Sequence, residues 1–212
     1  MILMGSFDFR SCDKVAVIGG AFDPIHYGHL AAAQTVYENF DVDKVVLMPL
    51  GDAPHKNMSS TTADERFKMV MAAVSDNPAF AVSDMEIRRS GKTYTVDTVE
   101  QIKSINPNID IYFVMGADEL ESIDTWRQPQ KIFSLCRVIA VSRPGYNTEG
   151  LIRKIDEVKK KYKGEAYFLE IPSLDISSSD LRQKIKDGRS VKYLMPKEAE
   201  KYIIEHDLYK EG

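Results

Sequence analysis

Residues 15–33 read VAVIGGAFDPIHYGHLAAA, and the first signal of the fold lies here. The opening VAVI is rich in β-branched side chains, which favour a buried strand. Gly19 and Gly20 follow, and glycine lets the backbone turn sharply and approach a ligand closely. The apolar run that begins at Leu30 predicts a helix after the turn. The stretch therefore predicts a strand, a glycine turn and a helix, which together open a crossover unit.

His26 and His29 lie three residues apart at the predicted start of this helix, so their imidazoles are expected on one side of it. Unpaired backbone N–H groups and the positive end of the helix dipole favour phosphate at such a position. Two imidazoles there could donate hydrogen bonds to a phosphate that gains negative charge during a reaction. The spacing therefore predicts a phosphate site for nucleotide chemistry.

A zinc site is the main alternative for this histidine pair. Zinc needs a third or fourth ligand, and the nearby candidates are Asp23 and His55. The two cysteines, Cys12 and Cys136, form no Cys-x-x-Cys pair. We therefore expect no metal ion held by the protein. A purely structural role for the histidines is less favoured still, because glycines flank them.

Composition limits the domain organisation and the partners. The chain has 212 residues, 43% of them hydrophobic, which is enough for one well-buried core. We expect a single domain over residues 13–212, preceded by a flexible N-terminal extension over residues 1–12. The net charge of −4 argues against a nucleic-acid partner. No apolar run approaches the roughly 20 residues that span a bilayer, so no membrane partner is expected. Two distant cysteines without a secretion signal indicate a cytoplasmic location.

Strand and helix patterns alternate along the rest of the chain. Strands are expected at 44–48, 80–82, 109–115, 137–141 and 166–170. Helices are expected near 62–74, 95–105, 148–162, 179–186 and 196–205. Such alternation predicts an α/β fold with a doubly wound, mainly parallel sheet, helices on both faces and a small C-terminal helical part.

Four motifs fall where strands of this sheet are predicted to end, at residues 19–29, 54–56, 116–118 and 177–182. Ligands of such sheets bind beyond the carboxyl ends of the strands, so we expect the motifs to converge on one cleft. In the last motif, serine hydroxyls and Arg182 could clamp a phosphate. Alternatively, the serines cap a helix and Arg182 pairs with a surface acid.

The motifs GGAFDPIHYGHL and ISSSDLR resemble those of the H-x-G-H nucleotidyltransferases. Finer motifs resemble the bacterial nicotinate-nucleotide adenylyltransferases from about residue 14 to residue 209. They are PHK at 54–56, KTYTVDT at 92–98, GAD at 116–118, Trp126 and RPG at 143–145. The resemblance implies a Rossmann-like fold and a single nucleotidyltransferase domain.

The resemblance also implies a reaction. ATP and nicotinate mononucleotide would give nicotinate adenine dinucleotide (deamido-NAD) and pyrophosphate, a step of NAD biosynthesis, with Mg²⁺ carried by the ATP. The nearer alternative is an adenylyltransferase for nicotinamide mononucleotide or another phosphorylated acceptor. The farther alternative is a nucleotide sensor without catalysis. The sequence leaves open whether the protein is a homo-oligomer.

Three sets of site residues follow from the resemblance. The catalytic set is His26, His29 and Arg182. The ATP-binding set is Gly19, Gly20, Phe22, His26, His29, Gly116, Asp118, Ser178 and Arg182. The set that binds nicotinate mononucleotide is Lys56, Thr93, Tyr94, Thr95 and Trp126.

One position departs from the family pattern. Ala21 stands where the family has Thr or Ser, whose hydroxyl touches the phosphate of the mononucleotide. We expect its absence to weaken substrate binding by one hydrogen bond at most, about 0.5–1.5 kcal/mol.

Overall fold

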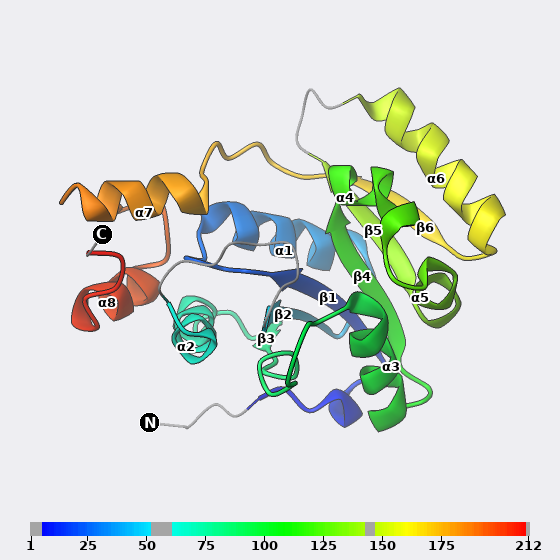
Figure 1. Ribbon diagram of the computed structural model, residues 1–212, viewed down its shortest axis with the longest axis horizontal. Coiled ribbons are helices and arrows are strands. Elements are labelled where there is room, and N and C mark those ends of the chain that lie inside the picture. Colours follow the sequence, from blue (N-terminus) through cyan, green and yellow to red (C-terminus); the bar gives the residue numbers. More distant parts are fainter. Residues whose placement is uncertain (1–5, 52–60, 143–146, 211–212) are drawn as a thin grey trace.

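The computed structural model describes residues 6–51, 61–142 and 147–210. Its centre is a six-stranded sheet of order β3-β2-β1-β4-β5-β6, in which every neighbouring pair is parallel (Figure 1). The strands are β1 (Lys14–Gly20), β2 (Lys44–Pro49), β3 (Phe80–Val82), β4 (Asp110–Gly116), β5 (Arg137–Ser142) and β6 (Ala166–Glu170). The strand order reverses between β1 and β4, which makes the sheet doubly wound and Rossmann-like. The predicted fold class is confirmed.

Helices cover both faces of the sheet. They are α1 (Tyr27–Asn39), α2 (Ala63–Ala73), α3 (Thr95–Ile105), α4 (Ala117–Glu121), α5 (Pro129–Leu135), α6 (Thr148–Tyr162), α7 (Ser178–Lys186) and α8 (Lys197–Glu205), with 3-10 turns η1 (Phe9–Ser11) and η2 (Ile123–Thr125). No helix in the described part of the chain is long and apolar enough to cross a membrane.

Two apolar clusters form the core, one on each face of the sheet. Val15 and Val17 of β1 belong to the cluster that includes α3, α5 and α6, whereas Ala16 belongs to the cluster of α1, α2 and α8. Successive side chains of a strand point to opposite faces, so one strand contributes to both clusters. This burial on both faces explains the continuous apolar runs by which the strands were predicted.

The N-terminal segment differs from the prediction, because residues 6–12 are part of the fold. Phe9 is 1% exposed and lies in the apolar cluster of α3 and α5. The Phe7 N–H donates to the Val82 carbonyl at 2.9 Å, and the Asn106 side chain donates to the Phe9 carbonyl at 3.1 Å. The expectation of a flexible extension over residues 1–12 therefore does not hold for residues 6–12. Aromatic burial and backbone hydrogen bonds hold this segment against the sheet.

Candidate active site

The two histidines of the predicted phosphate site cap α1. The His26 Nδ1 accepts a hydrogen bond from the Gly28 N–H at 3.1 Å, and the His29 Nδ1 accepts one from the His26 N–H at 3.2 Å. Because His26 is the capping residue, α1 begins at Tyr27, three residues before the predicted start. The rings stack with their centroids 3.8 Å apart. A neutral imidazole that accepts at Nδ1 carries its proton on Nε2, so the caps prepare both rings to donate from Nε2.

Gly28 and Phe22 support this arrangement from two sides. A Cβ built on Gly28 would lie 3.0 Å from the His26 ring, so any larger residue there would push the ring aside by a few tenths of an ångström. Phe22 is 1% exposed and packs edge-on against the His29 ring at 5.1 Å between centroids. Phe22 therefore lies beside the histidines, and it is not among the described residues that line the cavity at the carboxyl ends of β1 and β4. A Cβ built on Gly20 would lie 2.9 Å from the Phe22 ring. Gly20 is likewise not among the described lining residues of that cavity.

A cavity of about 580 Å³ lies at the carboxyl ends of β1 and β4. Its lining includes residues from three of the four predicted motifs: Gly19, His26, His29, Gly116, Asp118 and Ser178. The fourth motif, residues 54–56, lies outside the described residues, and so does Lys56. Gly116 is the capping residue of the short helix α4. The carboxylate of Asp118, an exposed residue, lies next to Gly116 at the start of this helix. The predicted convergence on one cleft is therefore observed for the motifs that the structure describes.

The start of α7 is hydrogen-bonded to the loop between β1 and α1. The Ser178 hydroxyl donates to the Pro24 carbonyl at 2.8 Å, and the Arg182 Nη1 donates to the Asp23 carbonyl at 2.6 Å. The Arg182 side chain is 32% exposed. These bonds place Arg182 beside the loop that leads to the histidines. Its guanidinium is hydrogen-bonded to the main-chain carbonyl of Asp23 in that loop. Ser177 caps α7 by accepting from the Asp180 N–H at 3.1 Å.

Asp23 is a buried carboxylate that the prediction did not include among the site residues. It accepts hydrogen bonds from the Tyr209 hydroxyl at 2.7 Å and the Thr61 hydroxyl at 2.5 Å, and Arg182 lies 3.9 Å from its second oxygen. Burial, together with the adjacent Asp23 charge, raises the pKa of Tyr209 far above its usual range, so the phenol remains a donor. The C-terminal segment thereby holds the loop that carries the histidines.

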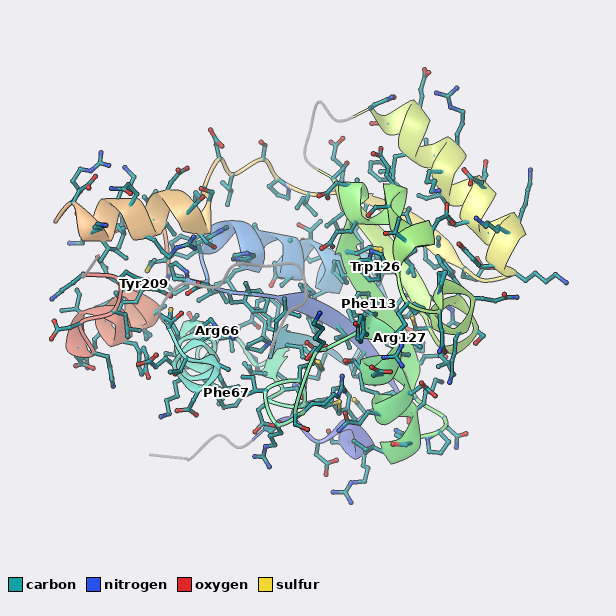
Figure 2. The ribbon with its side chains drawn as sticks, in the orientation of Figure 1. Arg66, Phe67, Phe113, Trp126, Arg127 and Tyr209 are labelled. Carbon is teal, nitrogen blue, oxygen red and sulfur yellow. The ribbon has the colours of Figure 1, made fainter. Side chains whose placement is uncertain are left out.

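Arg66 is a second buried residue that sequence reasoning missed (Figure 2). It is 2% exposed, and its two terminal nitrogens donate to the carbonyls of Ala21 at 2.9 Å and Leu50 at 2.7 Å. Burial lowers its pKa, while the negative charge of Asp23 acts in the opposite direction. Arg66 therefore ties the segment after β1 to the segment after β2. Its only sequence signal is its place on the apolar face of α2, one turn before Met69.

The predicted acceptor residues Thr93, Tyr94, Thr95 and Trp126 are absent from the described lining of the cavity. Thr93 is buried beside Gly51, the glycine that follows β2, because a Cβ built on Gly51 would lie 3.2 Å from the Thr93 hydroxyl. Trp126 is half-buried against the apolar cluster of α3 and α5 (Figure 2). Of these residues, Tyr94 and Thr95 lie at the start of α3, and none of the four is among the described residues that line the cavity.

Asp124 anchors the turn that carries Trp126. It accepts hydrogen bonds from Lys154 at 2.9 Å, from Lys161 at 2.8 Å and from the Tyr162 hydroxyl. The bonds from Lys161, Tyr162 and Lys154 hold the pKa of Asp124 far below its usual range. The carboxylate is therefore charged at neutral pH and fixes η2 against α6.

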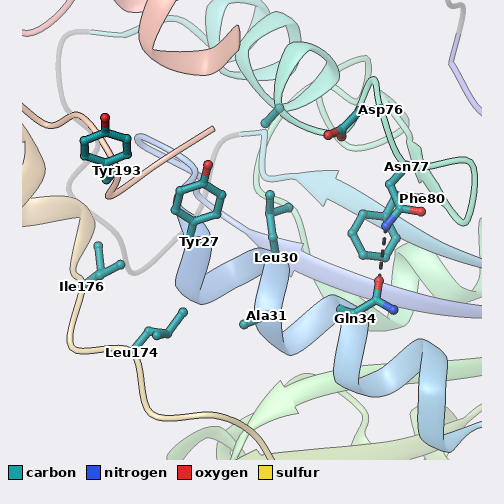
Figure 3. A pocket seen from close by; sticks show the side chains of 11 residues that line it. Tyr27, Leu30, Ala31, Gln34, Asp76, Asn77, Phe80, Leu174, Ile176 and Tyr193 are labelled. Atoms are coloured by element: carbon teal, nitrogen blue, oxygen red, sulfur yellow. Dashed lines mark hydrogen bonds between the residues drawn. The ribbon is translucent and has the colours of Figure 1, made fainter. Parts of the chain in front are cut away.

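The described residues contain no group of three or more His, Cys, Asp and Glu side chains that could hold a metal ion. A second hollow, of about 660 Å³, lies on the other side of α1 (Figure 3). Its described lining shares Leu174 and Ile176 with the first cavity but holds none of the predicted site residues. Asn77 and Gln34 both line this hollow, and the Asn77 amide donates a hydrogen bond to the Gln34 side chain at 3.2 Å.

The doubly wound sheet and the paired histidines facing the start of α7 define a class of nucleotide-binding transferases. Residues 17–184 match the family model described as cytidylyltransferase-like, and the chain belongs to that family.

Curated relatives show to which group within this family the chain belongs. The chain is 40% identical to a probable nicotinate-nucleotide adenylyltransferase of Thermoanaerobacter sp. (strain X514), over 93% of this chain and 94% of the relative. It is 38% identical to one of Desulfitobacterium hafniense (strain DSM 10664 / DCB-2), over 93% of this chain and 96% of the relative. The chain therefore belongs to the nicotinate-nucleotide adenylyltransferases.

Solved structures agree with the fold. A Plasmodium falciparum nicotinic acid mononucleotide adenylyltransferase complexed with NaAD matches with a TM-score of 0.73 and 21% identity, over 93% of this chain and 97% of that one. At this identity the match supports the architecture alone.

Proposed function

We propose that this protein transfers the adenylyl group of ATP to the phosphate of nicotinate mononucleotide, giving nicotinate adenine dinucleotide and pyrophosphate in NAD biosynthesis. One observation carries the proposal beyond family membership: His26, His29, Ser178 and Asp118 line a single cavity. These groups match the parts of a nucleotide, because N–H and hydroxyl donors suit phosphate and an exposed carboxylate suits ribose hydroxyls.

The reaction needs positioning and charge stabilisation more than proton transfer. A phosphate monoester is largely dianionic at neutral pH, so its oxygen can attack the α-phosphorus of ATP without a general base. The new P–O bond forms as the bond from the α-phosphorus to the bridging oxygen breaks, and pyrophosphate leaves with the electron pair. The Nε2–H groups of His26 and His29 stabilise the charge that develops on the α-phosphoryl oxygens.

The remaining residues hold the substrates. Gly19 and Gly20 let the backbone approach the phosphates closely, with Phe22 behind the histidine pair. Ser178 and Arg182 hold the leaving pyrophosphate, for which Arg182 exchanges the Asp23 carbonyl for a phosphate oxygen. Gly116 and Asp118 hold the ribose. Lys56, Thr93, Tyr94, Thr95 and Trp126 receive the mononucleotide.

We expect Mg²⁺ to enter this site bound to the phosphates of ATP. Mg²⁺ keeps several waters in its coordination shell and binds readily through substrate phosphates, with few protein ligands. When bound, it neutralises part of the phosphate charge. The free thiols of Cys12 and Cys136 support the cytoplasm as the location of the protein.

A competition assay tests this function. Purified protein is given ATP and Mg²⁺ with equal amounts of nicotinate and nicotinamide mononucleotides, and pyrophosphate and both dinucleotides are measured. We expect nicotinate adenine dinucleotide as the main product. Predominant formation of the nicotinamide dinucleotide would reassign the acceptor, and ATP binding without pyrophosphate release would point to a nucleotide sensor.

A further inference from the structure

Ser142 is the last residue of β5 and lies in the wall of the nucleotide cavity. It is 5% exposed, and its hydroxyl has no hydrogen-bond partner among the described residues. Its carbonyl, by contrast, accepts a hydrogen bond from the Ile171 N–H at 3.0 Å. A buried hydroxyl without a partner is unfavourable, and most such groups in folded proteins are paired. The exception here borders a cavity in which a ligand can supply the missing partner.

The order of the strands indicates which part of a nucleotide reaches Ser142. The phosphate-binding groups lie at β1 and the start of α1, and the ribose-binding carboxylate of Asp118 follows β4. β5 is the next strand beyond β4, and Gly116 of β4 pairs with Val141, the residue before Ser142. Neighbouring strands are about 4.8 Å apart, so the cavity extends about 10 Å from β1 to β5. A nucleotide whose phosphates lie at β1 and whose ribose lies at β4 directs its base toward β5.

The chemistry around Ser142 also suits a base. Val141, Ile171 and Pro172 line the same end of the cavity and offer apolar surface. A heteroaromatic base has flat apolar faces and a polar edge, whereas ribose and phosphate are polar throughout. An apolar slot with one hydroxyl in its wall therefore matches a base better than either of the other parts.

We propose that the Ser142 hydroxyl hydrogen-bonds the edge of the adenine ring of ATP and is a base-recognition group of this enzyme. The inference rests on the proposed function for the identity of the nucleotide. The cytidylyltransferase-like family model does not name the base that this chain selects. Ser142 lies at a point where the choice of base can be made.

Nucleotide binding without acceptor tests the proposal. ATP titrations by calorimetry compare the wild type with Ser142→Ala and with the control Ser134→Ala, which removes the same atom from an exposed site on α5. We expect Ser142→Ala to weaken ATP binding about 3- to 10-fold, as for one neutral hydrogen bond. Ser134→Ala should bind ATP as the wild type does. An unchanged ATP affinity in Ser142→Ala would overturn the proposal.

Two further probes separate the base from the other parts of ATP. Inorganic tripolyphosphate should bind the wild type and Ser142→Ala equally, because it has no base. With 2′-deoxy-ATP and 3′-deoxy-ATP, the Ser142→Ala effect should persist. If tripolyphosphate binding weakens, or if the effect disappears with either deoxynucleotide, Ser142 contacts phosphate or ribose and the assignment to the base is wrong.

Thermal unfolding without nucleotide checks for a merely structural role. Removal of a hydroxyl without a partner should leave the melting temperature unchanged or raise it, whereas removal of one that stabilises the core should lower it. A lowered melting temperature would contradict the absence of a partner and overturn the proposal. Because the titrations need neither acceptor nor turnover, a wild type that fails the competition assay but binds ATP still tests Ser142 separately from the proposed function.

Discussion

Substitutions of His29 separate the catalytic contribution of its ring from its structural contribution. The Nδ1 of His29 accepts the His26 N–H at 3.2 Å, while its Nε2 is the proposed donor to the α-phosphoryl group. His29→Ala removes both interactions. In His29→Asn the side-chain oxygen lies close to the position of Nδ1 and can keep the capping bond, but no donor reaches the Nε2 position.

The two losses have different magnitudes. Loss of one preorganised transition-state donor lowers kcat about 10²- to 10³-fold, or about 2.7–4 kcal/mol. Loss of a helix cap lowers the free energy of unfolding by about 1 kcal/mol, which corresponds to about 2–4 °C in a chain of this size. We therefore expect both kcat and the melting temperature to be lower in His29→Ala than in the wild type. In His29→Asn, kcat should fall as far as in His29→Ala, while the melting temperature should stay close to that of the wild type.

Steady-state pyrophosphate release at saturating substrates measures kcat, and scanning calorimetry measures the melting temperature. Near-normal turnover in His29→Asn would refute the role of Nε2. A fall in melting temperature as large in His29→Asn as in His29→Ala would refute the capping argument, because Asn should preserve the acceptor.

Three further outcomes are expected. Tyr209→Phe removes a donor from the buried carboxylate of Asp23 and should lower the free energy of unfolding by about 1–3 kcal/mol in urea titrations; a value unchanged from the wild type would contradict the role of this bond. Burial raises the pKa of Glu86 to about 6 from an ordinary 4.5, so the folded state binds its proton more tightly and stability should fall as pH rises from about 4.5 to 6. In Glu86→Gln, the decrease in the free energy of unfolding over this pH range should be smaller by up to about 2 kcal/mol. If urea unfolding of Glu86→Gln shows the same pH profile as that of the wild type, the raised pKa of Glu86 is contradicted. Gly28→Ala must displace the His26 ring, so kcat should fall at least 10-fold with KM for ATP less affected, and wild-type kinetics would show that the ring position is not critical.

Much of the fold could be predicted because local pattern and tertiary role agree. α3, α6 and β6 begin and end at the predicted residues, since caps, apolar periodicity and strand propensity all act over short distances. The convergence of Gly19, Gly116 and Ser178 was also predictable, because parallel strands bring their carboxyl ends to one edge of the sheet. The short helix α4 was missed, because five residues carry almost no periodic signal.

Contacts between distant segments depended on tertiary packing alone. The hydrogen bond from Tyr209 to Asp23 joins residues 186 positions apart, and the clamp of Arg66 on Ala21 joins residues 45 apart. Phe9 is buried although it precedes every strand, and the Ser142 hydroxyl has no described partner although serine is usually paired when buried. Local propensity acts over a few residues, whereas the partner of a buried polar group depends on which elements the sheet order places beside it. The residue types and the helix and strand periods were therefore readable in the chain, and the partners of its buried polar groups were established only when the sheet and helices packed together.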